Sequence, residues 1–399
     1  MRRTRALRGQ GAWFGACVLL ALGACSGDSQ PRTSVGEGPA DYFGDRSLPE
    51  WSLSEDALLV LTGGREPGEP EFFRIAGAVR HPSGGIVVAN AGSRELLFYS
   101  DEGHFLRAVG GQGSGPGEFR GLDGIGRIPG DSIVAVDGAL RRITVLDEAG
   151  GLGRTAPLPV DPTNYSLVGT FADGSLLLRS TLSMMPGPEP IRRPTLLVRY
   201  SLEGNVLDTI ASVPGLPIYA IEVSGGQGLR AVPFGPDAHA AVSGQRAYVG
   251  MGDEPVVEVR DDSGRVRDRI RWDAPERQVS DADRRAHRDR TLAATPSRTI
   301  RRLRAREFDG GDVRFPPSYP AHASIEAGPG GEIWVEGYPR TGARARHWLI
   351  FDQDGRPMAH FALEARSELL AVGEAHLVLK AQDRMGTESV RVHGLVRER

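Results

Sequence analysis

Short apolar runs separated by turns of glycine and acidic residues recur along the chain, and two such stretches align without gaps. They are EFFRIAGAVRHPSGGIVVANAGSRELLFYSDEG, from Glu71, and EFRGLDGIGRIPGDSIVAVDGALRRITVLDEAG, from Glu118. In both, the same spacing separates the leading glutamate from the isoleucine, Ile86 or Ile133, that opens an apolar run. An offset of about 47 residues, with four short strands in each unit, is typical of propeller blades.

The same alternation of strand and turn continues in four later units, at residues 169–213, 240–272, 323–363 and 368–398. Their hairpin turns contain Asp, Asn and Gly, which adopt positive φ at low cost. The pattern predicts an all-β fold, a six-bladed β-propeller of four-stranded antiparallel blades over residues 51–399. The early strand Ala57–Leu61 is predicted to complete the blade formed by the C-terminus, which would remove exposed sheet edges.

Residues 88–119, VANAGSRELLFYSDEGHFLRAVGGQGSGPGEF, resemble an NHL repeat, the module of a family of six-bladed propellers. Residues 134–150, VAVDGALRRITVLDEAG, resemble a second, partial copy, and the clear match covers about residues 65–150. Asn90 stands where that family usually has Asp, whereas Asp137 keeps it. NHL-like propellers are mostly interaction modules, so the resemblance implies a non-catalytic binding role.

The glycine-rich stretch GGQGSGPGEF, residues 110–119, has two interpretations. A phosphate-binding loop would lie between a strand and a helix, with lysine and Ser or Thr following. The continuation GEFRGLDGIG predicts no such helix. We therefore expect a crossing from the outer strand of one blade to the inner strand of the next, where glycine permits a tight path and Phe119 packs between the blades.

Residues 276–308 interrupt the β pattern between the fourth and fifth predicted blades. Ser280, followed by Asp281 and Asp283, predicts a helix start, and Pro296 with Ser297 predicts the end of that helix and the start of another. The second helix carries apolar residues on one side and arginines on the other. Two interpretations stay open: an arm that packs its apolar stripe on the propeller, or a lid or docking arm that offers arginines to an anionic ligand, a phospholipid head group or a protein.

Residues 1–24 predict a secretory signal, with four arginines followed by the apolar segment AWFGACVLLALGA. The segment ends in Leu22-Gly23-Ala24-Cys25, which resembles a bacterial lipobox and implies a lipid on Cys25; an ordinary cleaved signal is the alternative. Residues 25–50 read as a flexible tether rich in Ser, Gly, Pro and Asp. Ser26 after the cysteine favours the outer membrane, by resemblance to a sorting rule. The predicted location is the bacterial cell envelope, with the membrane as a partner through the anchor.

The chain carries 48 basic and 51 acidic residues, a net charge of −3. Cleavage of the signal would remove four arginines and leave a net charge of about −7, which disfavours a nucleic-acid partner. It would also remove Cys17, so Cys25 would be the only cysteine left and no disulfide could form.

Each predicted inner strand is preceded by a polar residue, and these are the candidates for binding at the mouth of the central channel: Arg74, Asp123, Tyr165, His239, His322 and Arg366. His239 and His322 occupy similar points of successive units, so they are predicted to face each other. With Asp237 or Asp123 they are candidate ligands for a divalent metal such as zinc or calcium. The alternative is that they serve as hydrogen-bonding histidines at strand starts. No other cofactor is predicted.

The sequence contains no Gly-x-Ser-x-Gly or His-Glu-x-x-His motif, and its acidic pairs lie in predicted hairpin turns. The predicted function is that of a lipid-anchored binding or scaffold module for a protein, peptide or glycan. The alternative is a metal-dependent lyase or lactonase-type hydrolase acting at the central channel. In that case His239 and His322 would be ligands, and Arg74 or Arg366 would polarise the substrate.

Overall fold

The computed structural model describes residues 39–44, 47–160, 162–223, 226–275 and 277–397. The predicted signal peptide, Cys25 and most of the predicted tether lie outside these residues. Residues Glu37–Arg399 belong to one compact unit. Among the residues described, no helix has both the length and the hydropathy needed to cross a bilayer.

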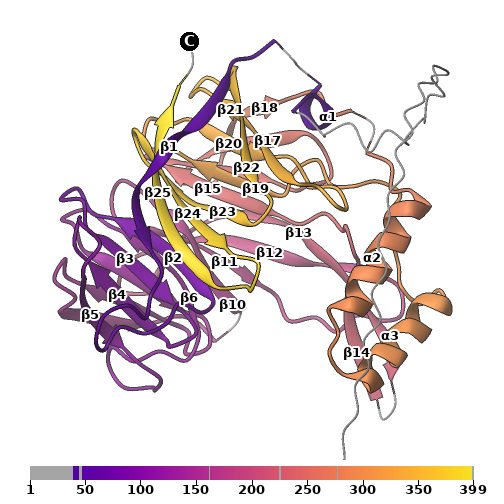
Figure 1. The fold of residues 1–399 in the computed structure, drawn as a ribbon, viewed down its shortest axis with the longest axis horizontal. Coiled ribbons are helices and arrows are strands. Elements are labelled where there is room, and N and C mark those ends of the chain that lie inside the picture. Colours follow the sequence, from indigo (N-terminus) through magenta and orange to yellow (C-terminus); the bar gives the residue numbers. More distant parts are fainter. Residues whose placement is uncertain (1–38, 45–46, 161, 224–225, 276, 398–399) are drawn as a thin grey trace, which may run out of the picture. The chain divides into compact units, whose positions relative to one another are not determined.

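The fold is all-β, as predicted, and consists mainly of antiparallel sheets of four or five strands (Figure 1). The first sheet contains β2 (Ile75–Arg80), β3 (Ile86–Asn90), β4 (Glu95–Tyr99) and β5 (Phe105–Gly110). The second contains β6 (Leu122–Arg127), β7 (Ile133–Asp137), β8 (Arg142–Leu146) and β9 (Leu152–Pro157). The third contains β10 (Thr163–Thr170), β11 (Leu176–Thr181), β12 (Ile191–Tyr200), β13 (Val206–Val223) and β14 (Gly226–Ala231).

A fourth sheet and a larger composite sheet complete the strands of the described chain. The fourth contains β15 (His239–Ser243), β16 (Arg246–Gly250), β17 (Val256–Asp261) and β18 (Val266–Arg271). The composite sheet contains β19 (Ser324–Ala327), β20 (Ile333–Glu336), β21 (Ala345–Phe351), β22 (Pro357–Glu364), β1 (Glu50–Leu61), β25 (Glu388–Val396), β24 (His376–Gln382) and β23 (Ser367–Val372), in that order.

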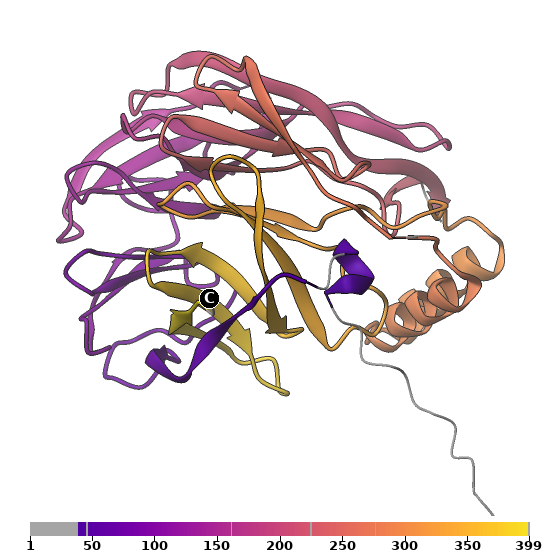
Figure 2. The ribbon, with the colours of Figure 1, turned by 90° about the horizontal axis from the view of Figure 1, so that it is seen from above.

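The first strands of successive sheets contact one another around a common centre (Figure 2). β2 contacts β6, β6 contacts β10, β10 contacts β15, and β15 contacts β19. β23 then contacts both β19 and β2. Sheets placed radially in this way form a β-propeller. One side of the ring is where the first strand of each sheet begins and the second strand terminates. We call this side the mouth.

Strand β1 joins the two ends of the chain, as predicted. It pairs antiparallel with β25, for example Ala57 with His393 and Leu61 with Val390. It begins earlier than the predicted strand, at Glu50, and its first two residues pair parallel with β22. This short parallel pairing is what merges β19–β22 and β23–β25 into one composite sheet.

The glycine-rich stretch is a corner between two sheets, as predicted. It leads from β5 to β6, and Gly110, Gly111 and Gly117 have φ values of 112°, 124° and 78°. The Glu118 carboxylate accepts the Gly115 N–H at 2.7 Å, which holds the loop closed on itself. Phe119 is fully buried in a core cluster with residues of both sheets.

The third sheet departs from the prediction of four strands. β13 continues past Pro214 and Pro217, and a hairpin returns as β14, which pairs from Ile218–Ala231 to Val223–Gly226. The reason is a second apolar run, Ile218 to Val223, that directly follows the predicted outer strand and ends at glycines. The sequence interpretation ended this unit at residue 213 and so missed the hairpin.

Two helices lie between β18 and β19 in the chain: α2 (Asp281–Ala293) and α3 (Arg298–Asp309). The predicted caps are confirmed. The Ser280 side chain accepts the Asp283 N–H, the Asp283 carboxylate accepts the Ser280 N–H, and Ser297 caps α3. Neither helix has a fully buried residue. The apolar side chains of α3 border a partly open groove against β14, so the apolar stripe faces the propeller but is only partly covered.

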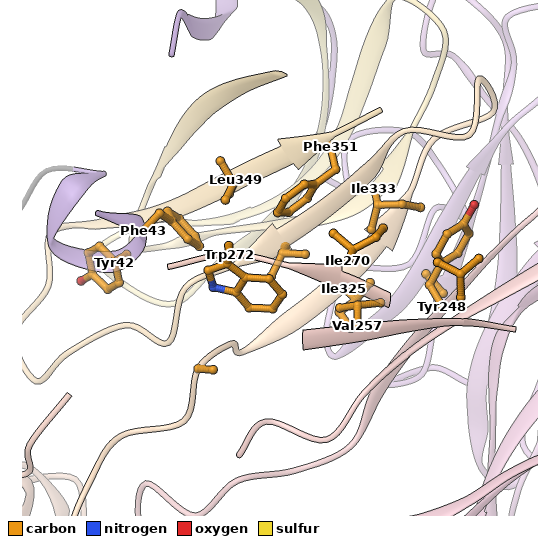
Figure 3. Packing of buried hydrophobic residues seen from close by; sticks show 14 residues of the cluster. Tyr42, Phe43, Tyr248, Val257, Ile270, Trp272, Ile325, Ile333, Leu349 and Phe351 are labelled. Carbon is orange, nitrogen blue, oxygen red and sulfur yellow. The ribbon is translucent and has the colours of Figure 1, made fainter. Parts of the chain in front are cut away.

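The core lies between neighbouring sheets. One cluster fills the space between β15–β18 and β19–β22 and includes Trp272, Ile325 and Phe351 (Figure 3). The short helix α1 (Ala40–Phe43) adds Tyr42 and Phe43 to this cluster. Residues 40–43 fall inside the predicted flexible tether of residues 25–50, but they are packed against the propeller before β1 begins, because Tyr42 and Phe43 are apolar rings that join the core.

Candidate functional site

Arg74 and Asp123 lie at the start of β2 and β6, on the mouth side. The Asp123 carboxylate accepts the Gly138 N–H at 2.9 Å. Burial raises the pKa of Asp123, the Gly138 hydrogen bond opposes that shift, the neighbouring Asp137 adds to it, and the Arg74 guanidinium lowers it. The structure therefore places these two predicted residues within electrostatic reach of each other.

His239 and His322 face each other, as predicted. Their ring centroids are 5.3 Å apart at an interplanar angle of 73°. His322 is fully buried, and its Nε2 accepts the Gly252 N–H at 3.0 Å. Gly250 makes room for the ring, because a Cβ there would lie 2.5 Å from the Nε2 atom of His322.

Both histidines are neutral at neutral pH. The pKa of His322 is lowered to about 3, mainly by burial and to a smaller extent by the neighbouring His239 and Arg277. Burial also lowers the pKa of His239, an effect that Asp237 opposes and Arg179 supports. Neutral imidazole is the form that binds metals. The Nε2 of His322, however, is already engaged by a backbone donor.

Asp237, the predicted third ligand, is engaged as well. The Nη2 of Arg179 donates to both of its carboxylate oxygens at 2.8 Å, and Oδ1 also accepts the Ala238 N–H. Across the described parts of the chain, no group of three or more His, Cys, Asp or Glu side chains is arranged to hold a metal ion. The Nε2 of His322 and the Asp237 carboxylate thus have protein partners at the start of β15 and β19, whereas the Nδ1 of His322 is buried without a hydrogen-bond partner.

Tyr165 and Arg366 lie apart from these residues. Tyr165 is buried, with its ring T-shaped against Tyr200 at 6.1 Å, in the core between the second and third sheets. Its predicted place at the mouth is filled instead by Asn164, which is exposed and has a left-handed φ of 58°. Arg366 is exposed in the turn before β23 and donates to the Asp383 carbonyl at 3.0 Å.

A charged cluster at the mouth was not predicted. It contains residues from five strands, which we call the carboxylate cluster: Glu326 (β19), Glu336 (β20), Arg346 (β21), Glu368 (β23) and Lys380 (β24). Glu336 is fully buried and accepts hydrogen bonds from Arg346 Nη2 at 2.8 Å and from Ser324 Oγ at 2.9 Å. Glu368 forms an ion pair with Lys380 at 2.5 Å.

Glu326 has no ionic partner of its own in this cluster. Its pKa is raised to about 8, mainly by burial and also by the neighbouring Glu336 and Glu368, while Arg346 opposes the shift. The carboxyl is therefore mostly protonated at neutral pH and is able to donate a hydrogen bond. The signal in the sequence was a glutamate inside each of two short apolar strands, SIEA and IWVE.

A cavity of about 420 Å³ lies beside the carboxylate cluster, and we call it the mouth cavity. Its lining combines α2, the β20–β21 loop and the mouth of the ring: Phe234, Arg290, Ala323, Tyr338, Pro339, Arg340, Thr341, Gly342, Ala343, Arg346 and Ala365. Arg290 of α2 donates to the Thr341 hydroxyl at 3.2 Å, which links the helix to the loop. Three guanidinium groups thus border one cavity, and aromatic rings form part of its wall.

The mouth cavity has the composition of a site for an acidic group. Guanidinium groups bind carboxylates and phosphates through paired donors, and aromatic rings supply apolar contact. Each of the three guanidiniums already has a contact in the fold: Arg346 pairs with Glu336, Arg340 donates to the Asp41 carbonyl, and Arg290 donates to the Thr341 hydroxyl.

No protein-family model matches this chain, and no curated protein matches it. Among solved structures, a member of the DUF4221 family from Bacteroides vulgatus is similar, with a TM-score of 0.51 and 10% identity, covering 87% of this chain and 98% of that one. A gluconolactonase from Xanthomonas campestris gives a TM-score of 0.44 and 12% identity, covering 86% and 99% of the two chains. A catalytically inactive virginiamycin B lyase from Staphylococcus aureus gives 0.42 and 11%, covering 82% and 83%. At these identities the likeness concerns the fold alone.

Proposed function

We propose that this chain is a six-bladed propeller lipoprotein of the bacterial cell envelope, held at the outer membrane by a lipid on Cys25. The cyclic contacts of β2, β6, β10, β15, β19 and β23 support the count of six blades. In that count α2 and α3 are an insertion between the fourth and fifth blades. The arginine-rich start, the apolar segment and Leu22-Gly23-Ala24-Cys25 support the anchor.

The propeller serves as a binding module for a protein, peptide or glycan whose acidic group enters the mouth cavity. The observation that carries this proposal is the convergence of Arg290, Arg340 and Arg346 on one cavity of about 420 Å³. That volume is in the range of natural ligand sites. Because the guanidiniums come from the insertion and from the ring, ligand binding requires both parts.

The metal-dependent lyase or lactonase alternative has less support. It needs His239 and His322 as ligands, but the Nε2 of His322 accepts a backbone N–H, and Arg179 engages Asp237 through both oxygens. Of its two proposed substrate-polarising groups, Arg366 lies in an exposed turn and donates to a backbone carbonyl, and Arg74 lies near the Asp123 carboxylate.

A photo-crosslinker at position 343 tests the binding proposal in cells. Ala343 lines the mouth cavity, whereas Met385, which is 90% exposed in the turn between β24 and β25, does not line it and gives a control position. We expect a specific adduct from position 343 and none from 385. Arg290→Glu should abolish the adduct, and Arg285→Glu, an exposed arginine of the same helix outside the cavity, should preserve it. An adduct that survives Arg290→Glu, or none from position 343, would overturn the proposal.

A further inference from the structure

Helix α3 presents an arginine stripe made of Arg298, Arg302 and Arg306. Their spacing of four residues places them along one face of the helix. All three are exposed, and within the described chain their side chains form no hydrogen bond or ion pair. In contrast, Arg301 and Arg304 of the same helix donate to Thr295.

The stripe belongs to the most basic part of the described chain. Together, α2 and α3 contain nine arginines and five acidic residues, a net charge of about +4 in a chain whose net charge is −3. The charge is therefore segregated rather than spread over the surface. Unpaired exposed guanidiniums in such a patch attract an anionic surface over about a Debye length.

Apolar side chains lie on the other side of α3 from the stripe. Ile300 and Leu303 of α3 are 49% and 44% exposed, and Leu229 of the facing hairpin is 44% exposed. They border a groove of about 620 Å³ between α3 and β13–β14. A helix with arginines on one side and exposed apolar residues on the other has the composition of a helix that lies in a membrane interface.

The chain that leads to the anchor enters the propeller on the same side as these helices. The Asp41 carbonyl of α1 accepts a hydrogen bond from Arg340 Nη2 at 3.3 Å, and the adjacent Thr341 accepts one from Arg290 of α2. Figure 1 and Figure 2 show α1 and the helix pair on the same side of the sheets. The fourteen or so residues between Cys25 and Pro39 reach at most about 50 Å when extended. An anchored propeller therefore has this side within reach of the lipid.

We propose that the α2–α3 arm is a membrane-docking surface that lays Arg298, Arg302 and Arg306 on anionic phospholipid head groups and places Ile300 and Leu303 at the interface. This inference rests on the proposed lipid anchor, which supplies the proximity. Docking holds the mouth cavity, which α2 helps to line, next to the bilayer.

Vesicle sedimentation of residues 26–399, which lack both the predicted signal peptide and Cys25, tests docking without the acyl group. We expect binding to vesicles of phosphatidylcholine with phosphatidylglycerol and little binding to phosphatidylcholine alone. Each arginine near an anionic surface contributes about fivefold to partitioning, so Arg298→Gln, Arg302→Gln and Arg306→Gln together should lower it about a hundredfold. The control triple Arg271→Gln, Arg384→Gln and Arg391→Gln removes the same charge from exposed sites on the strands and turns and should have a small effect.

Equal losses in the two triple variants would overturn the docking surface, as would equal binding to the neutral vesicles. Labelling of cells with radioactive palmitate reports separately on Cys25. If the protein is labelled but the two triple variants bind vesicles equally, the lipid anchor is supported and the docking surface is refuted. If the protein is not labelled but the stripe variant alone loses vesicle binding, the lipid anchor is refuted and the docking surface is supported.

Discussion

Replacing Glu326 by glutamine should stabilise the protein at neutral pH. In the folded state burial raises the pKa of this carboxyl to about 8, against an ordinary value of 4.5. Between those values the folded protein holds a proton that the unfolded chain releases. Folding therefore takes up a proton, and the stability contributed at this site falls as the pH rises from 4.5 to 8. Glutamine has nearly the shape of the protonated side chain and carries no such penalty.

The magnitude follows from the size of the shift. At pH 7 the unfolded carboxyl is 2.5 pH units above its pKa, and each unit corresponds to about 1.4 kcal/mol, so the penalty is about 3 kcal/mol. With an unfolding entropy of about 2.1 cal/mol/K per residue over roughly 360 residues, Glu326→Gln should raise Tm by about 4 °C. At pH 5 the gain should shrink to below about 1 kcal/mol.

Urea unfolding at pH 5, 6, 7 and 8, followed by tryptophan fluorescence, measures this effect. Glu336→Gln is the matched control, because it makes the same chemical change one strand away with the opposite expected sign. Glu336 is buried and paired with Arg346, so removing its charge should cost about 3 kcal/mol. A Glu326→Gln variant that is no more stable than wild type at pH 7, or whose gain is the same at pH 5 and pH 8, would refute the reasoning.

Two further predictions concern the mouth and the glycine corner. Burial keeps His239 and His322 neutral in the folded state, whereas the histidines of the unfolded chain protonate below about pH 6.5. The free energy of unfolding should therefore fall between pH 6.5 and 4.5, by up to about 1.4 kcal/mol per pH unit for each histidine. His239→Gln should make this pH dependence less steep in urea titrations, and an unchanged pH dependence would contradict the assignment of His239. Gly110→Ala should cost about 2–3 kcal/mol, since φ is 112° and a Cβ would lie 2.9 Å from the Phe119 ring. Gly111→Ala, with φ 124° and no atom within 4 Å, should cost about 1 kcal/mol; equal thermal destabilisation would show that crowding against the ring is not the cause.

The strands and caps were predictable because they follow from local rules. Ile86 and Ile133 open β3 and β7, whose residues are all buried, and the aligned repeats place both strands correctly. Ser280 and Ser297 cap helices because a side-chain oxygen before a helix accepts an otherwise unpaired N–H. The facing of His239 and His322 followed from the same reasoning, since repeated units bring equivalent positions together.

The carboxylate cluster was not predictable because it depends on pairings between strands. Glu326, Glu336 and Arg346 meet through the register of β19, β20 and β21, and Glu368 joins them from β23. A single sequence does not reveal the register of these strands or which neighbouring strand supplies the additional glutamate. Tyr165 was assigned to the mouth but is buried in the core. Side chains alternate between the two faces of a strand, so an error of one residue in the strand start exchanges an exposed side chain for a buried one.

The pairing of β1 with β25 determines the order in which the strands of the composite sheet can pair during folding. The antiparallel partner of β1, residues 50–61, is β25, residues 388–396. The first strand of the described chain therefore cannot complete its antiparallel pairing until the last strand has been synthesised. Contacts of such long sequence separation slow folding and leave a strand edge open to other chains meanwhile. Removal of the last dozen residues would delete all of β25 and leave β1 without its antiparallel partner, so the composite sheet would lose the pairing that joins the two ends of the chain.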